Sequence, residues 1–325
     1  LLPLPASRWL GPEGYGAFAA LLSAQLLVAV PSLALQAVVA RELVRGTPSG
    51  ALRSLGARVA ALVAVIAALA VVPVSLALDT PVLATAAALA PGPVLCLLAT
   101  EQGLLQGAER FRALGAVLAL AGAGKVVPAV AVLAAGGGVG PALAAGAVGV
   151  ALAWAGAAWI RAAGAGAGSG PAAAGAGTLT SPGVAAVLAA GQVQLVMMAL
   201  TSVDLLLARA LLSPEDAGRY ALGAVAAKAA FWLPQAVGTV LYPRMADPAG
   251  HRGAVRFAVR VLLGIGALVV VAAAVAGPLV PAVVGEDYRP VAGVLWAFAA
   301  LGVTLSVLQA LLLACQPLES PLQLL

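Results

Sequence analysis

The sequence contains very little charge. Only 9% of its 325 residues are Asp, Glu, Lys or Arg, whereas 63% are hydrophobic, and the mean hydropathy is +1.08. A water-soluble domain of this length needs polar faces on its elements, and this composition cannot supply them. The composition therefore excludes a soluble protein and predicts one that lies in a membrane.

Cysteine and histidine are also scarce. Cys96 and Cys315 each lie inside an apolar run, so there is no disulfide framework and no metal-ligand spacing. His251 is the single histidine, and no Ser-His-Asp set can be assembled around it. We therefore expect no catalytic residues, no metal, no cofactor and no nucleic-acid partner.

Long apolar runs are abundant. A helix rises ~1.5 Å per residue and the hydrocarbon layer is ~30 Å thick, so a run of about twenty residues spans it. Nine runs are candidates: 16–40, 55–78, 82–108, 113–135, 139–160, 183–211, 218–243, 255–276 and 291–315. Residues 1–10 are expected to form the outer end of another span. Because no basic segment with a cleavage site follows the first residue, we expect no signal peptide. The runs predict an all-α polytopic membrane protein with about ten spans.

One of these runs carries a face of small residues. In 139–160, small residues recur at every fourth position: Ala145, Gly149, Ala153 and Ala157. Such a face lets a neighbouring helix approach closely.

The sequence repeats itself at an offset of about two hundred residues. Leu10-Gly11-Pro12-Glu13 precedes Leu212-Ser213-Pro214-Glu215 by 202 positions, and Gly16 precedes Gly218 by the same offset. Pro31 and Arg41 match Pro234 and Arg244 at an offset of 203. Internal repeats are a mark of secondary transporters. The pattern predicts two bundles, related by an axis along the membrane normal and arranged around a central cavity.

The arginines predict the orientation in the membrane. Eleven lie at one set of alternate loops: Arg41, Arg45, Arg53, Arg58, Arg110, Arg112, Arg161, Arg244, Arg252, Arg256 and Arg260. Four lie at the other set: Arg8, Arg209, Arg219 and Arg289. By the positive-inside rule the first set is cytoplasmic, so both copies of the repeat start outside and are parallel.

Residues 162–182 consist mainly of Ala and Gly and carry no charge. This composition predicts a flexible cytoplasmic linker between an N-terminal bundle, 1–161, and a C-terminal bundle, 183–325. The alternative is that part of the segment continues a helix, because Ala is helix-forming.

Polar residues inside the runs are the candidates for function. On 218–243, Lys228, Trp232, Gln235, Thr239 and Tyr242 are spaced 4, 3, 4 and 3, which places them on one helical face. Similar stripes occur on 16–40 and 183–211. Because polar groups avoid lipid, the stripes are expected to line the substrate cavity. The predicted cavity residues are Lys228, Asp204, Gln235, Thr201, Gln194, Gln25, Ser32 and Gln36. The alternative is interhelical hydrogen bonding worth about 1 kcal/mol or less for each residue.

Two intramembrane ion pairs are predicted. Asp204 lies eight residues before the outer turn at 213–218 and Lys228 ten after it, so both are at similar depth. Pairing avoids a charge left alone in the membrane. The pair is either structural, or it provides a cation that meets an anionic substrate while the carboxylate is its exchangeable partner. Glu101 and Lys125 form the second predicted pair.

Four segments resemble the polysaccharide-exporter branch of the multidrug/oligosaccharidyl-lipid/polysaccharide (MOP) superfamily. They are LGPEGYGAF at 10–18, DLLLARALLSPEDAGRY at 204–220, LPQAVGTVLYPR at 233–244 and VGEDYRPVAGVLWAF at 284–298. The resemblance covers about residues 8–315 and implies a Wzx-like flippase for a polyprenyl-diphosphate-linked oligosaccharide. It also implies a MATE-like fold of two six-helix bundles around a cavity. The chain lacks most of the first helix and everything after the tenth, so we expect a fragment.

The resemblance further implies a multi-pass protein of the cytoplasmic membrane that works beside a polysaccharide polymerase and glycosyltransferases. A cation-coupled multidrug exporter of the MATE type shares the fold and is the alternative. A membrane-embedded glycosyltransferase or ligase needs carboxylates or His clustered in a large outer loop. The predicted outer loops here are short, so we do not expect an enzyme.

Overall fold

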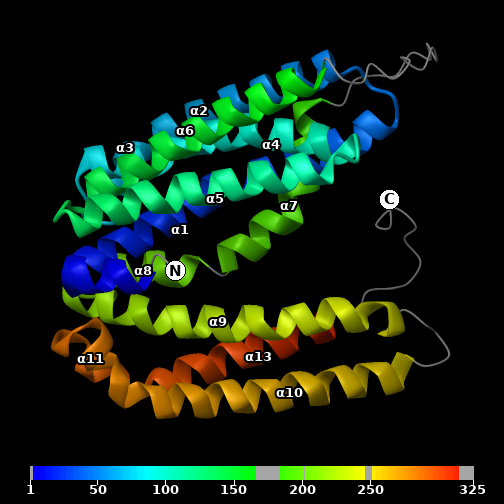
Figure 1. Cartoon of the computed structure of the whole chain (residues 1–325). Coiled ribbons are helices and arrows are strands. Elements are labelled where there is room, and N and C mark those ends of the chain that lie inside the picture. Colours follow the sequence, from blue (N-terminus) through cyan, green and yellow to red (C-terminus); the bar gives the residue numbers. More distant parts are fainter. Residues whose placement is uncertain (1–2, 166–182, 201, 246–250, 315–325) are drawn as a thin grey trace. The chain divides into compact units, whose positions relative to one another are not determined.

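The computed structural model describes residues 3–165, 183–200, 202–245 and 251–314, and every regular element in these ranges is helical (Figure 1). The long helices are α1 (Pro3–Val44), α2 (Ser49–Ala77), α4 (Pro91–Gly107), α5 (Phe111–Ala134), α6 (Val139–Ala165), α7 (Val184–Leu200), α9 (Pro214–Met245), α10 (His251–Ala276) and α13 (Leu295–Ala314). The shorter helices are α3 (Val82–Leu89), α8 (Val203–Leu211), α11 (Val280–Val284) and α12 (Arg289–Ala292). Two 3-10 turns, Gly277–Leu279 and Glu286–Tyr288, flank α11.

Several of these helices are long and apolar enough to cross a bilayer. Within the described residues there are 6 such spans, or up to 7 if the bent pair Glu286–Ala292 and Leu295–Leu308 counts as one span. Large apolar side chains such as Leu69, Leu76 and Leu83 point outward, as expected for helices surrounded by lipid. The prediction of an all-α, multi-pass membrane protein is confirmed.

The run 183–211, predicted as one span, forms two helices. α7 ends at Leu200 and α8 begins at Val203. Between them Ser202 has φ −123° and ψ −24°, outside the helical region, and serves as the N-cap residue of α8 without a side-chain cap. The apolar composition of the run identified its length and could not reveal this break.

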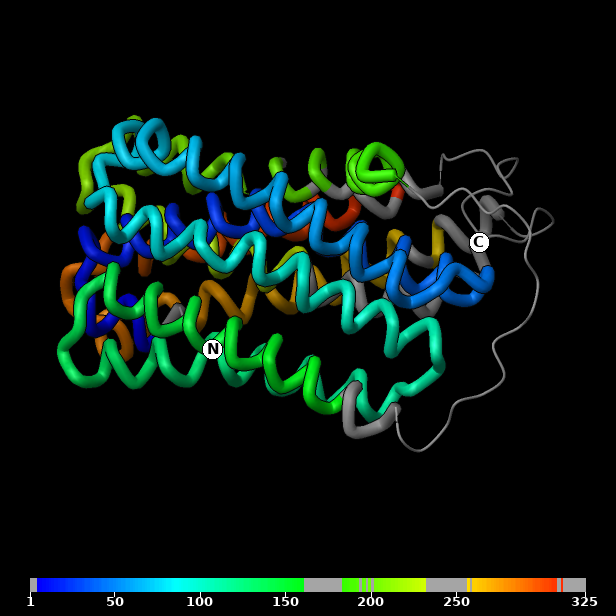
Figure 2. The backbone as a smooth tube through the Cα atoms, turned by 90° about the horizontal axis from the view of Figure 1, so that it is seen from above, coloured from blue at the N-terminus to red at the C-terminus, as the bar shows by residue number. Residues whose placement is uncertain are grey.

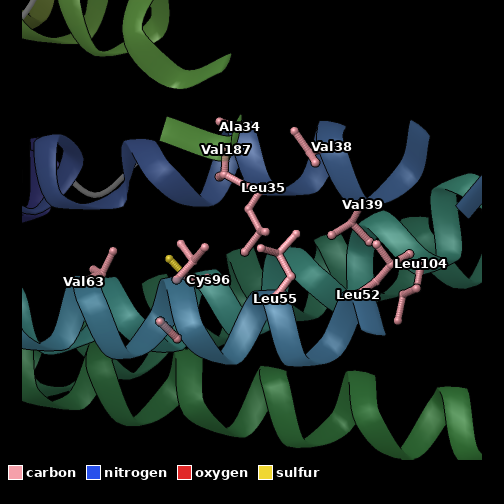
Figure 3. Close-up of a cluster of buried hydrophobic side chains, with 12 residues drawn as sticks. Ala34, Leu35, Val38, Val39, Leu52, Leu55, Val63, Cys96, Leu104 and Val187 are labelled. Atoms are coloured by element: carbon pink, nitrogen blue, oxygen red, sulfur yellow. The ribbon is translucent and has the colours of Figure 1, made fainter. Parts of the chain in front are cut away.

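The chain divides into two compact units, Leu1–Gly218 and Arg219–Leu325. In the first unit α1 packs against α2, α4, α7 and α8, and α5 packs against α6. Buried side chains from α1, α2, α4 and α7 meet in one cluster, in which Leu35, Leu55, Cys96 and Val187 are fully or almost fully buried (Figure 3). The turns after α1 and after α4 lie at one end of this unit, and the turns after α2 and after α5 lie at the other (Figures 1 and 2).

The division differs from the boundary predicted at 162–182. The sequence assigned 183–211 to the C-terminal bundle, but α7 and α8 belong to the first unit. The physical reason is packing on α1: Val187 of α7 joins the buried cluster around Leu35, and Gly191 leaves room for Ala34, whose Cβ would lie 3.2 Å from an added Cβ. The predicted linker itself falls almost wholly outside the described residues.

Close backbone contact joins α5 to α6. A Cβ on Gly149 would overlap the carbonyl oxygen of Gly124, so neither helix could approach as closely with a larger residue there. Ala153 and Ala157, on the same face of α6 as Gly149, are fully buried. The small-residue face predicted on 139–160 is confirmed, and it fixes where Lys125, the next residue after Gly124, enters the bundle.

Arg209 ties α8 to the end of α2. Its Nε donates a hydrogen bond to the Leu78 carbonyl at 2.9 Å, and its Nη2 donates to the Asp79 carbonyl at 3.1 Å. These carbonyls follow the last turn of α2, where helices leave acceptors without partners and where the helix dipole favours a cation. Arg209 therefore acts as a C-terminal cap for α2 from 131 positions along the chain.

The second unit has its own small core. Ala230, Ala299 and Val303 are buried together, and Gly302 allows close contact with the Ala227 carbonyl. Tyr220 and Phe298 meet edge to face with their ring centroids 5.4 Å apart. The Arg219 Nε also donates a hydrogen bond to the Asp287 carbonyl at 3.0 Å. These contacts bring the segment 284–298 against the start of α9.

Candidate functional site

The structure describes only some of the predicted cavity residues. Thr201 and the side chains of Gln194 and Gln235 lie outside what the structure describes. Asp204 belongs to the first unit and Lys228 to the second, so the ion pair between them stays a prediction. Of Asp204 itself, the Oδ1 atom is buried and has no hydrogen-bond partner in the described residues.

The polar stripe on α1 is turned inward but serves two different roles. Gln36 donates from Nε2 to Oε1 of Gln106 on α4 at 3.0 Å, and the Ser32 hydroxyl donates to the Ala29 carbonyl of its own helix at 2.6 Å. The Gln36 bond is interhelical, as in the alternative interpretation of the stripe, whereas the Ser32 bond stays within α1. Gln25 differs from them. It is only 3% exposed, and its Oε1 has no partner among the described residues.

Glu101 is in an ion pair with Arg53 of α2, at 3.5 Å between Oε1 and Nε. The predicted pair of Glu101 with Lys125 is not found among the interactions of the described residues. The reason is depth. Glu101 lies six residues before the end of α4, about 9 Å along the helix, whereas Lys125 lies fourteen residues after the start of α5, about 21 Å along it. The two helices meet at the short turn 108–110, so these two depths do not match.

Lys125 instead shares a pocket with Gln25. The pocket lies between α1, α5 and α6 in the first unit. Its lining residues are Phe18, Leu22, Gln25, Lys125, Ala129, Ala142, Leu143 and Gly146. The free volume of this pocket is about 10 Å³, close to what a single water molecule needs. The pocket thus combines one cation and one amide with an otherwise apolar wall.

Sequence reasoning identified both polar residues and missed that they belong together. Gln25 was assigned to a stripe along α1, and Lys125 to a pair with Glu101. They lie one hundred positions apart on different helices, and no periodicity connects them. The only sequence signal at this place is the glycine spacing, because Gly124 and Gly149 set the crossing of α5 and α6 beside Lys125.

The pocket offers two binding groups, an ammonium and an amide. Within the described residues no group of three or more His, Cys, Asp and Glu side chains could hold a metal ion. The acidic side chains near membrane depth are Glu101, which faces Arg53, and Asp204. Other buried polar side chains of the first unit, such as Ser75, Thr80 and Thr85, are hydrogen-bonded, whereas Gln25 Oε1 and Asp204 Oδ1 have no partner among the described residues.

Comparison with solved structures identifies the fold. The sequence matches no protein-family model and no characterised protein. The structure is similar to a solved structure described as the inward-facing conformation of a multidrug resistance MATE family transporter of the MOP superfamily, with a TM-score of 0.66 and 13% sequence identity. The similarity covers 96% of this chain and 78% of that one. At this identity it establishes the fold, and so the chain is a multi-pass membrane protein with the fold of MATE transporters of the MOP superfamily.

Proposed function

We propose that the protein is a secondary transporter that moves a polyprenyl-diphosphate-linked oligosaccharide across the cytoplasmic membrane for polysaccharide biosynthesis. The observation that supports transport is the MATE-like fold over 96% of the chain. The order and spacing of the segments at 10–18, 204–220, 233–244 and 284–298 support the lipid-linked substrate, because they resemble the polysaccharide-exporter branch.

Lys228 and Asp204 are the residues proposed to handle the substrate. In this proposal Lys228 attracts the diphosphate, and Asp204 holds that cation when no substrate is bound. Two unit charges about 4 Å apart interact by roughly 4 kcal/mol at an effective dielectric of 20, so exchanging a carboxylate for a diphosphate keeps the cation compensated. The remaining polar residues of the stripes, including Gln194, Thr201 and Gln235, complete the proposed cavity. A polymerase and glycosyltransferases are the proposed partners.

A cation-coupled multidrug exporter is the second candidate, because the similar solved structure is a multidrug resistance MATE transporter. The two candidates differ in the charge of the substrate. The flippase would carry an anionic diphosphate lipid. The multidrug exporter would carry an organic molecule that is neutral or cationic. Substrate class therefore separates them.

Reconstituted vesicles test both candidates. One arm measures how fast a labelled polyprenyl-diphosphate oligosaccharide becomes accessible to an impermeant glycan-modifying enzyme, and the other measures efflux of an organic cation dye under an imposed ion gradient. We expect lipid transfer without dye efflux, and loss of transfer in Lys228→Gln but not in Arg112→Gln, a cation exposed at the start of α5. Dye efflux without lipid transfer would favour the exporter. The absence of both from folded protein would reject transport of these classes.

A further inference from the structure

Lys125 has no counter-charge among the side chains that the structure describes. It lies nine residues before the end of α5 at Ala134, about 14 Å from that end of the helix and therefore inside the hydrocarbon layer. Within the described residues it makes no ion pair. A lone charge at this depth is strongly disfavoured unless something compensates it.

The acids of α1 and α4 lie near the helix ends or are already paired. Asp204 on α8 has a buried Oδ1 without a partner among the described residues, but it does not line the pocket. α5 and α6 contain no Asp or Glu. On α4 Glu101 is with Arg53, and on α1 Glu42 is with Arg41 and Arg45 near the end of the helix. The other acid of α1, Glu13, lies at its opposite end next to the break at Gly11. No carboxylate lines the pocket.

We propose that the pocket between α1, α5 and α6 binds a small monovalent anion, chloride, between the Lys125 ammonium and the Gln25 amide. The free volume of the pocket is about 10 Å³, which is too small for a sugar, a diphosphate or an organic drug. A halide ion is somewhat larger than a water molecule, so binding it requires the long Lys125 side chain to shift. The other lining residues, among them Phe18, Leu22 and Leu143, are apolar. An apolar wall disfavours strongly hydrated, multiply charged anions such as phosphate or sulfate.

Gln25 supplies the second contact. Its side chain is buried and makes no hydrogen bond within the described residues. An amide presents a donor on one side and an acceptor on the other, and a half-turn exchanges them without changing the shape of the side chain. Turning Nε2 into the pocket therefore breaks no hydrogen bond and gives the anion a second donor. A single water could also bridge the two residues, but it would leave the charge of Lys125 uncompensated.

Small residues create the space. An added Cβ on Gly146 would lie 3.2 Å from the Lys125 carbonyl oxygen and 3.9 Å from its Cγ, so a larger residue would press on the lysine. Ala129 and Ala142 form the neighbouring wall. The pocket is thus a consequence of the close α5–α6 packing.

The test is the thermal stability of the purified full chain in detergent, with no lipid-linked oligosaccharide or drug present. Sodium chloride is exchanged for sodium gluconate at constant sodium concentration and ionic strength. We expect chloride and bromide to raise the Tm saturably, on the order of a few degrees, because a ligand that binds only the folded state stabilises it. Sulfate and inorganic phosphate should give no saturable shift, only the gradual rise that strongly hydrated anions cause in folded proteins generally.

Three variants identify the site. Lys125→Gln should abolish the chloride-dependent shift, and Gln25→Leu, which removes the donor and keeps an uncharged side chain, should weaken chloride binding several-fold. Arg112→Gln removes the same charge from an exposed position on the same helix and should leave the shift intact. If Lys125→Gln does not fold, the decision rests on Gln25→Leu and on binding of radiolabelled chloride to the wild-type chain.

The proposal is overturned if chloride has no effect, if Lys125→Gln or Gln25→Leu shows the same shift as wild type, or if phosphate stabilises and halides do not. Because the measurement contains no transported substrate, its outcome is independent of whether the protein moves a lipid-linked oligosaccharide.

Discussion

Arg209 shows how a charge can be buried without a carboxylate. It is 8% exposed, two of its nitrogens donate to carbonyls at the end of α2, and its Nη1 has no partner in the described residues. Arginine suits this position because its planar fork reaches two neighbouring carbonyls at once. From the sequence it was assigned only to the outer side by the positive-inside rule, since the carbonyls that it contacts carry no signature of their own.

We expect Arg209→Leu to lower the free energy of unfolding by about 2 kcal/mol, because it removes two charge-assisted hydrogen bonds and leaves two carbonyls without a donor. Arg209→Lys should recover only part of this, since an ammonium cannot span both carbonyls. Thermal unfolding followed by tryptophan fluorescence measures the effect. Arg289→Leu is the control, because its ion pair with Glu286 is 74% and 70% exposed and should contribute less than about 1 kcal/mol. Equal losses in the two variants would contradict the capping role.

The two members of the Arg53–Glu101 ion pair are expected to differ in how much their removal destabilises the protein. The Glu101 side chain is 7% exposed, whereas that of Arg53 is 38% exposed. Arg53→Met takes the cation away from a buried carboxylate, so we expect a loss of about 2 kcal/mol or more. Glu101→Gln should cost less, because Arg53 can turn toward water.

The double variant Arg53→Met with Glu101→Gln completes the cycle and should be more stable than Arg53→Met alone. The same unfolding measurement is used for all four proteins. A Glu101→Gln loss larger than that of Arg53→Met would mean that burial does not decide the cost of this pair.

At the scale of elements, the α5–α6 crossing depends on two glycines. We expect Gly149→Ala to destabilise the first unit and to separate the two helices, because its Cβ would overlap the Gly124 carbonyl. Gly122→Ala is the matched control: it lies on α5 with open space around it, and a helical alanine there should be neutral or slightly stabilising. Thermal unfolding distinguishes them, and similar behaviour of the two variants would disprove the close contact.

The helices themselves were largely predictable, and their breaks were not. Apolar runs located α2, α5 and α6 because lipid forces every residue of a span to be compatible with hydrocarbon. The break before α8 depends on the backbone of Ser202, and a hydroxyl residue in an apolar run gives no warning of it. The polar stripe on α1 could be predicted because it depends only on spacing along one helix. The proximity of Gln25 and Lys125 could not, because it depends on how α1, α5 and α6 pack together.

At the scale of the whole molecule, the topology can be checked with two positions on opposite ends of one helix. Ala108 and Ala135 are exposed residues just before and just after α5. In a background without the native cysteines, we expect Ala135→Cys to react with an impermeant thiol reagent in intact cells. Ala108→Cys should react only after permeabilisation, because the arginines beside it predict a cytoplasmic turn. The reverse pattern would invert the orientation.

The extent of the first unit also follows from the whole molecule. A repeat offset of 202 residues places the equivalent of residue 1 at position 203, so the boundary at Gly218 is a division by packing and does not coincide with the repeat. Composition instead suggested a division at the Ala- and Gly-rich segment 162–182. A change in composition can predict a linker. It does not show with which helices the segments on either side of the linker pack. Val187 packs against the α1 cluster, so α7 lies with the first unit.

The tie between Arg209 and α2 has a consequence for biosynthesis. Leu78 leaves the ribosome 131 residues before Arg209, which at ~5–20 residues per second is roughly 7 to 26 seconds. During that interval the helices α3 to α7 emerge, and the end of α2 must satisfy its carbonyls with water or lipid headgroups. A nascent chain arrested before residue 209 would therefore hold this end of α2 less firmly than one arrested after it. Protease sensitivity of the α2–α3 turn should fall abruptly once α8 has been inserted.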